Sequence, residues 1–192
     1  EEEREEEEEE KHPGRWLYEE GMAYWYGSDF KKKDLERGRM MIEASASSGF
    51  PIAVAFCHSQ GWNGLEADSK KAFEMYLKIE KETNGDHWAQ NMLGRCYKHG
   101  FGTDQDHNKT FEFYTKSAEQ GNSNAMNDVG GCYYSGLGCD ENDTKAFEWQ
   151  EKSAKLGCSY AMYNVGGFYE YGIEVTKDVN KAKEWYTKAA AQ

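Results

Sequence analysis

The chain has 192 residues, of which 38% are hydrophobic and 15% aromatic, so it can bury a substantial core. Its formal net charge is −12; nine Glu and one Arg in residues 1–10 contribute −8, which leaves −4 for residues 11–192. This mildly acidic body carries no basic stripe, which argues against a nucleic acid as partner. It also has no apolar run of about 18–20 residues, which argues against membrane insertion.

The acidic run EEEREEEEEE opens the chain. Like charges at helical spacing repel one another, so residues 1–14 are predicted to form an acidic tail or a frayed helix. The alternative is an acidic docking segment for a basic partner. The Pro-Gly pair in HPGR (12–15) marks the boundary with a single folded domain at residues 15–192.

The folded part is predicted to contain five repeats with a 36-residue period, at residues 15–49, 50–85, 86–121, 122–157 and 158–192. The clearest evidence is AMNDVGGCYYSG, which starts at Ala125 and returns as AMYNVGGFYEYG from Ala161. The same register relates Gly94, Gly130 and Gly166; Tyr97, Tyr133 and Tyr169; and Lys109, Lys145 and Lys181. Self-similarity at this period is typical of a solenoid, whose units cannot bury their apolar faces alone.

Each repeat is predicted to form two helices. In AQNMLGRCYKHG, Ala89, Leu93 and Tyr97 share one helical face, and KAFEWQEKSAKLG is a second amphipathic segment that ends at Gly157. Gly, Asp and Asn between the two helices suit a turn and a helix cap. The Gly inside each first helix costs about 1 kcal/mol relative to Ala, which indicates a close approach by another helix. We therefore expect an all-α, right-handed α-solenoid of about five helix-turn-helix repeats.

The pattern Ala-x-x-x-Leu-Gly-x-x-Tyr-x-x-Gly-x-Gly, followed by Asp and Lys-Ala-x-x-Trp-Tyr-x-Lys-Ala-Ala, resembles the Sel1-like repeat, a relative of the tetratricopeptide repeat. The resemblance covers residues 16–192 and is most specific in repeats three to five. The second repeat departs from it at His58 and Gly61, and the fifth at GIEVTKD (172–178). The resemblance implies a protein–protein interaction scaffold or adaptor that binds a peptide or partner domain on its concave face.

The sequence motifs predict neither an enzyme nor a metal or cofactor site. DQDHN (104–108) and DENDT (140–144) do not continue as calcium-binding loops, and no nucleophile elbow or nucleotide-binding glycine loop is present. The five cysteines have no paired spacing, so we expect free thiols and a cytoplasmic location. The sequons NKT and NDT leave a lumenal or secreted location open.

The first helix of each repeat is expected to line the concave groove, by analogy with the tetratricopeptide register. The groove residues predicted for binding are Trp25, Trp62, Trp88, Asn91, Arg95, Lys98, Asn127, Tyr134, Tyr160 and Tyr163. The same offsets add Tyr18, Met22, Tyr26, His99, Asn124, Gly131, Gly167, Glu170 and Tyr171. Rings would provide anchor area and Asn would pair with main-chain amides of a partner.

Two alternatives remain open. Any single ring can instead pack between neighbouring repeats. The whole chain can also act as a structural spacer or an oligomerisation module, because it ends at KAAAQ without a polar capping helix and would then self-associate through its last helix.

Overall fold

The computed structural model describes residues 12–26 and 33–191, and these residues form ten α-helices and no strand. The acidic run at residues 1–10 lies outside them. The helices form five antiparallel pairs along the chain. The pairs are α2 (Pro13–Tyr26) with α3 (Leu35–Ser47), α4 (Pro51–Gln60) with α5 (Ser69–Glu82), α6 (His87–His99) with α7 (His107–Glu119), α8 (Ser123–Ser135) with α9 (Asp143–Lys155), and α10 (Ser159–Tyr171) with α11 (Val179–Ala191).

The predicted caps are confirmed, and they explain where the helices begin and end. The side chain before each second helix accepts a hydrogen bond from the backbone N–H three residues later, as Asp106 does from Lys109 (3.0 Å) and Asn142 from Lys145 (2.8 Å). Four of the first helices end at a glycine in the left-handed region, namely Gly61, Gly100, Gly136 and Gly172. In the second repeat this glycine comes three residues earlier than the 36-residue register places it, so α4 is the shortest of the ten helices described.

The predicted close approach at the repeated glycine is also confirmed. A Cβ added to Gly94 would lie 2.4 Å from the ring of Tyr114, and one added to Gly166 would lie 2.6 Å from the ring of Tyr186. Real Cβ atoms do not come this close to another heavy atom, so the second helix of the pair could not pack at its present distance. The cost of glycine in the helix is thus offset by helix–helix packing.

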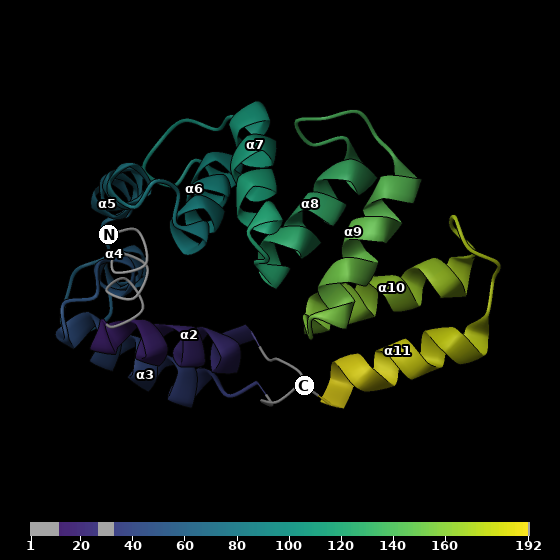
Figure 1. Cartoon of the computed structure of the whole chain (residues 1–192), viewed down its shortest axis with the longest axis horizontal. Coiled ribbons are helices and arrows are strands. Elements are labelled where there is room, and N and C mark those ends of the chain that lie inside the picture. The colour runs from purple at the N-terminus through teal and green to yellow at the C-terminus, as the bar shows by residue number, and fades with distance from the viewer. Residues whose placement is uncertain (1–11, 27–32, 192) are drawn as a thin grey trace, which may run out of the picture.

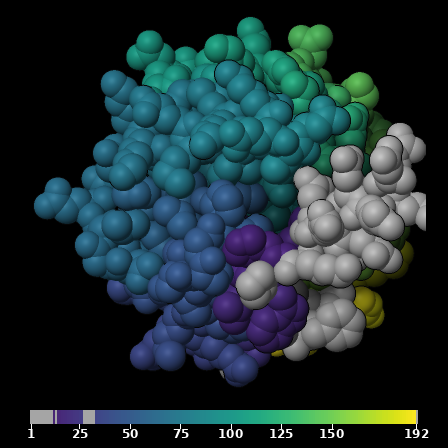
Figure 2. Space-filling model, turned by 60° about the vertical axis from the view of Figure 1, so that its left-hand side comes forward, coloured from purple at the N-terminus to yellow at the C-terminus, as the bar shows by residue number. Residues whose placement is uncertain are grey.

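The pairs follow one another around an arc (Figure 1). Helices α2, α6, α8 and α10 border the inside of this arc, and α3 and α11 lie on its outside. Repeats two and three form one continuous surface in the space-filling view, where they are blue and teal (Figure 2). The described helices include none that is long and apolar enough to span a membrane.

The first and fifth repeats touch each other across the arc. The Ser159 hydroxyl donates a hydrogen bond to the Tyr26 carbonyl (3.2 Å), and Lys33 Nζ donates one to the Tyr160 hydroxyl (3.1 Å). These partners are 133 and 127 residues apart in the sequence. These two hydrogen bonds connect the first and last repeats of the arc.

Candidate protein-binding face

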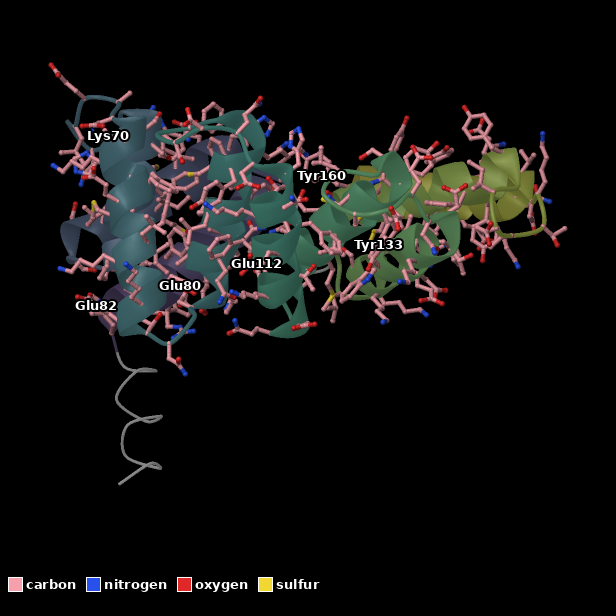
Figure 3. All side chains as sticks on the ribbon, turned by 90° about the horizontal axis from the view of Figure 1, so that it is seen from above. Lys70, Glu80, Glu82, Glu112, Tyr133 and Tyr160 are labelled. Carbon is pink, nitrogen blue, oxygen red and sulfur yellow. The ribbon has the colours of Figure 1, made fainter. Side chains whose placement is uncertain are left out.

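Two cavities open on the inside of the arc. The first, here called the central cavity, has a volume of about 290 Å³ and is bordered by four of the five repeats. Tyr160 from the fifth repeat, labelled in Figure 3, lies near the middle of the molecule's long axis. The residues that line the central cavity are Tyr26, Asn91, Arg95, Lys98, His99, Tyr114, Asn124, Asn127, Asp128 and Tyr160.

Arg95 extends from α6 across the central cavity to the first repeat. Its guanidinium donates a hydrogen bond to the hydroxyl of Tyr26. Burial raises the pKa of Tyr26, and the positive charge of Arg95 opposes that increase. The phenol therefore stays neutral and serves as an acceptor that links repeat three to repeat one.

Asp128 is the carboxylate of the central cavity. Its Oδ2 accepts a hydrogen bond from Asn91 Nδ2 at 3.2 Å. Burial raises the pKa of this carboxyl, and the charges of Lys98 and Arg95 partly oppose the shift. Two cationic side chains thus share the cavity with one carboxylate, so its lining favours polar and anionic groups.

The second cavity, here called the aromatic cavity, lies between repeats four and five and has a volume of about 410 Å³. Three of its tyrosines are exposed to solvent: Tyr134 by 54%, Tyr163 by 63% and Tyr171 by 70%. The hydroxyl of a fourth, Tyr186, donates a 2.6 Å hydrogen bond to Glu170. Its lining comprises Gly131, Tyr134, Gln150, Tyr163, Asn164, Gly167, Phe168, Glu170, Tyr171, Ile173 and Tyr186.

A network of amides connects the two cavities. Asn164 Nδ2 donates to Asn127 Oδ1 (3.1 Å) and to Gln150 Oε1 (3.3 Å), and Gln150 Nε2 donates to the Asn127 carbonyl (3.1 Å). The Oδ1 atom of Asn127 is thus already used within the protein. Within the described part of the chain its Nδ2 has no protein partner, which leaves a donor for a main-chain carbonyl of a ligand.

The structure brings most of the predicted groove residues together. Five of them line the central cavity, namely Asn91, Arg95, Lys98, Asn127 and Tyr160, and Tyr134 and Tyr163 line the aromatic cavity. Asn91 is only 1% exposed and its side chain is bonded to Asp128, so it supports the cavity wall and does not face solvent.

The three predicted tryptophans border neither cavity. Trp88 packs edge-on against Tyr18, with ring centroids 5.5 Å apart, and Trp25 packs against Trp62 at 5.0 Å. The prediction that Tyr18 and Met22 face the groove is wrong, because they are 0% and 1% exposed and belong to the core. The first repeat turns these side chains into the core, where they contact helices of repeats two and three.

Several cavity residues were not predicted. Asp128 and Asn164 occupy the register position that is buried Met92 in repeat three, so the change from apolar to polar was a usable signal. Tyr114, Gln150 and Tyr186 come from the second helices, which the tetratricopeptide analogy assigns to the outside. Among the described residues no group of three His, Cys, Asp or Glu side chains is placed to hold a metal ion.

Comparisons with known proteins agree with the observed fold. The Sel1 repeat family matches residues 17–50, 52–80, 89–122, 123–158 and 159–192. No curated protein matches the chain significantly.

Three solved structures are similar to it. The first is c5321, a protective antigen of uropathogenic Escherichia coli with an SLR fold; it is 30% identical over 95% of this chain, with a TM-score of 0.66. The second is a Sel1 repeat protein from Oxalobacter formigenes, which is 29% identical over 93% of this chain and also has a TM-score of 0.66. The third, an immunity protein from Pseudomonas aeruginosa, is 20% identical over 93% of this chain with a TM-score of 0.54 and shares the fold.

The chain spans 39% of the length of c5321, 68% of the Oxalobacter protein and 64% of the immunity protein. The five matched segments account for most of the chain and coincide with the five helix pairs. The protein therefore belongs to the Sel1 repeat family, whose helical solenoids generally serve as scaffolds for protein–protein interaction.

Proposed function

We propose that the protein is a non-catalytic scaffold or adaptor, and that residues 15–192 act as one domain that binds an extended segment of a partner protein on the inside of the arc. The observation that carries the proposal is the set of exposed rings on this face. Tyr134, Tyr160 and Tyr163 are 48–63% exposed beside amides and charges, whereas Tyr114 on the packing side of its helix is 1% exposed.

Exposed tyrosines beside polar groups suit a binding surface. A tyrosine provides a large contact area with few rotatable bonds, and its hydroxyl keeps a hydrogen-bond partner in water or in a complex. Amides such as the Asn127 side chain can pair with the main chain of an extended segment, as the free Nδ2 allows. The two cavities together would accept one segment, with polar side chains at the central cavity and apolar or cationic side chains at the aromatic cavity.

A display experiment tests the proposal. Phage-displayed random peptides are selected on the purified chain, and the affinities of selected peptides are measured by fluorescence anisotropy. We expect Tyr163→Ala to weaken binding by about thirtyfold, the effect of a typical aromatic anchor, without loss of helicity. Leu156→Ala is the matched control, since Leu156 is 53% exposed but lies in neither cavity. Equal binding by all variants would move the site to another face.

The alternative role is a structural spacer or oligomerisation module. It is favoured by α11, in which Ala182 is the one buried residue, whereas α9 buries four. Analytical ultracentrifugation separates the two roles. Self-association that disappears in Val179→Glu, where Val179 is 58% exposed, would support the alternative.

We also place the protein in a reducing compartment. All five cysteines are free, and burial raises the pKa of Cys57 to about 11 and those of Cys96 and Cys132 to about 12. Such thiols are protonated and unreactive at neutral pH. Titration of the unfolded, unreduced protein from its native source should find about five thiols; a count of three or fewer would contradict this location.

A further inference from the structure

The floor of the aromatic cavity is made of glycines that the fold does not require. Gly131 and Gly167 occupy the register position of Arg95, which fills the corresponding space in repeat three. A Cβ added to Gly131 would meet nothing within 4 Å, and one added to Gly167 would meet only the Tyr186 hydroxyl at 3.9 Å. Since glycine weakens a helix, two such positions without a packing reason indicate that open space is what they provide.

The walls above this floor are aromatic rings at several angles. Tyr163 and Tyr186 are tilted by 41° with centroids 5.1 Å apart, and Tyr134 meets Phe168 edge-on at 6.0 Å. Tyr171 adds a ring that is 70% exposed. The faces of aromatic rings carry negative potential and attract cations, so a cavity lined by several rings suits a cation.

The charge of the aromatic cavity has the matching sign. Glu170 is the one charged side chain among the described lining residues. Its Oε2 accepts the hydrogen bond from Tyr186, and it forms no ion pair with a basic side chain in the described part of the chain. Burial and the neighbouring Glu170 raise the pKa of Tyr186, so this phenol stays protonated and keeps the carboxylate in place.

Elsewhere this chain already places lysines on tyrosine rings. Lys109 lies over Tyr97 at 4.9 Å, and the equivalent pairs Lys145–Tyr133 and Lys181–Tyr169 follow at 5.1 and 5.2 Å. The four tyrosines of the aromatic cavity have no such cation from within the described chain. These rings are therefore available to a cation from outside.

We propose that the aromatic cavity binds a lysine or arginine side chain of a partner segment, with its cation on the tyrosine faces and paired with Glu170. The proposal rests on the proposed scaffold function and names the chemistry of the partner at this position. An acidic side chain would be repelled by Glu170, and an apolar one would leave its charge without a cationic partner, with only the Tyr186 hydroxyl among the described residues bonded to it. The net charge of residues 11–192, −4, would also attract a basic segment over longer distances.

The test uses three small probes that differ only in the side chain: the N-acetyl methylamides of lysine, arginine and norleucine. Each is titrated into the full chain and followed by NMR through the amides of Gly131 and Gly167 and the ring signals of Tyr163. We expect saturable shifts with lysine and arginine that weaken as salt increases, and no saturable shift with norleucine.

Variants connect the binding to the cavity. Glu170→Gln and Tyr163→Leu should each weaken the binding of the lysine and arginine probes by about fivefold or more. Gly131→Leu should fill the floor and abolish that binding without lowering the melting temperature, because its Cβ enters open space and Leu favours a helix more than Gly does. Tyr160→Leu is the control, since this exposed ring belongs to the central cavity.

Four outcomes would overturn the inference. Norleucine binding as tightly as lysine would show that the cavity does not select a cation. Normal binding of the lysine probe by Gly131→Leu would show that the cation binds outside this cavity. If the probes do not bind but display-selected peptides still depend on Tyr163, the scaffold function stands, and the proposal that the cavity takes a basic side chain is wrong. If the probes bind but no selected peptide depends on the inside face, the cavity takes small free cations, and the proposal that the cation belongs to a partner segment is wrong.

Discussion

The central and aromatic cavities are built from the same helix positions but have opposite chemistry. Arg95 in repeat three corresponds to Gly131 and Gly167, and Lys98 corresponds to Tyr134 and Glu170. The first set makes a polar cavity with two cationic side chains, bridged to the first repeat by the Arg95–Tyr26 hydrogen bond. The second makes an open aromatic cavity with one carboxylate.

This difference teaches how a solenoid separates folding from recognition. The packing positions Ala89, Ala125 and Ala161 are 0% exposed and identical in the three repeats. Each repeat needs them to contact its neighbours, whereas inner positions such as Tyr134 and Tyr163 are exposed to solvent. Exposed side chains of this kind can therefore change between repeats with little effect on the arc.

The largest expected effect is a difference in stability between two cavity tyrosines, one buried in the fold and one exposed. Tyr114 is 1% exposed and packs on Gly94, so Tyr114→Ala should lower the free energy of unfolding by about 3–5 kcal/mol. Tyr163 is 63% exposed, so Tyr163→Ala should change it by less than about 0.5 kcal/mol. Urea denaturation followed by circular dichroism measures both, and similar losses would remove the distinction.

The next largest effect concerns glycines: replacing them by alanine should change the free energy of unfolding in opposite directions in two repeats. Gly94→Ala places a Cβ 2.4 Å from the Tyr114 ring and should destabilise the protein by about 1–3 kcal/mol through overpacking. Gly131→Ala meets open space and should stabilise it by up to about 1 kcal/mol through helix propensity. Destabilisation by Gly131→Ala in the same denaturation experiment would mean that the aromatic cavity floor has a packing role.

A smaller, pH-dependent effect is expected from Asp128 in the central cavity. Burial raises its pKa above the ordinary 3.8, so the native state keeps a proton that the unfolded state has lost. Stability contributed by this group is present below pH 3.8 and is lost as pH rises through the native pKa. Asp128→Asn should thus be more stable than the parent at neutral pH, and the gain should vanish at acidic pH.

The Asp128→Asn variant keeps an acceptor for Asn91, so the comparison isolates the charge. Exposed Asp104→Asn is the matched control, measured by denaturation from pH 3 to pH 8. A loss of stability at neutral pH in Asp128→Asn would mean that attraction to Lys98 and Arg95 exceeds the cost of burial.

The smallest expected effect concerns the contact between the first and fifth repeats. Ser159→Ala removes the 3.2 Å hydrogen bond to Tyr26 and should reduce stability by about 1 kcal/mol or less. Hydrogen exchange should increase at the C-terminal end of α2 and the start of α10, with α8 unchanged. Equal exchange in variant and parent would mean that the central cavity does not depend on this contact.

Local patterns in the sequence were sufficient to predict the helices and their packing. The 36-residue register located five helix pairs, the Asp and Asn residues that cap the second helices, and glycines such as Gly94 at close approaches. These features depend on residues within one repeat or on its direct neighbour, where the helical period decides which side chains share a face. The same reasoning placed Asn91, Arg95 and Asn127 on the inside of the arc.

Only the tertiary structure decided which inside residues meet across the arc. The rotation between neighbouring pairs accumulates along five repeats, and it depends on the side-chain volumes at every interface. The sequence period therefore could not predict that Ser159 reaches Tyr26, or that Arg95 does so from repeat three. The accumulated rotation also brings the first repeat onto the third. Trp88 therefore packs against Tyr18 and does not enter the groove.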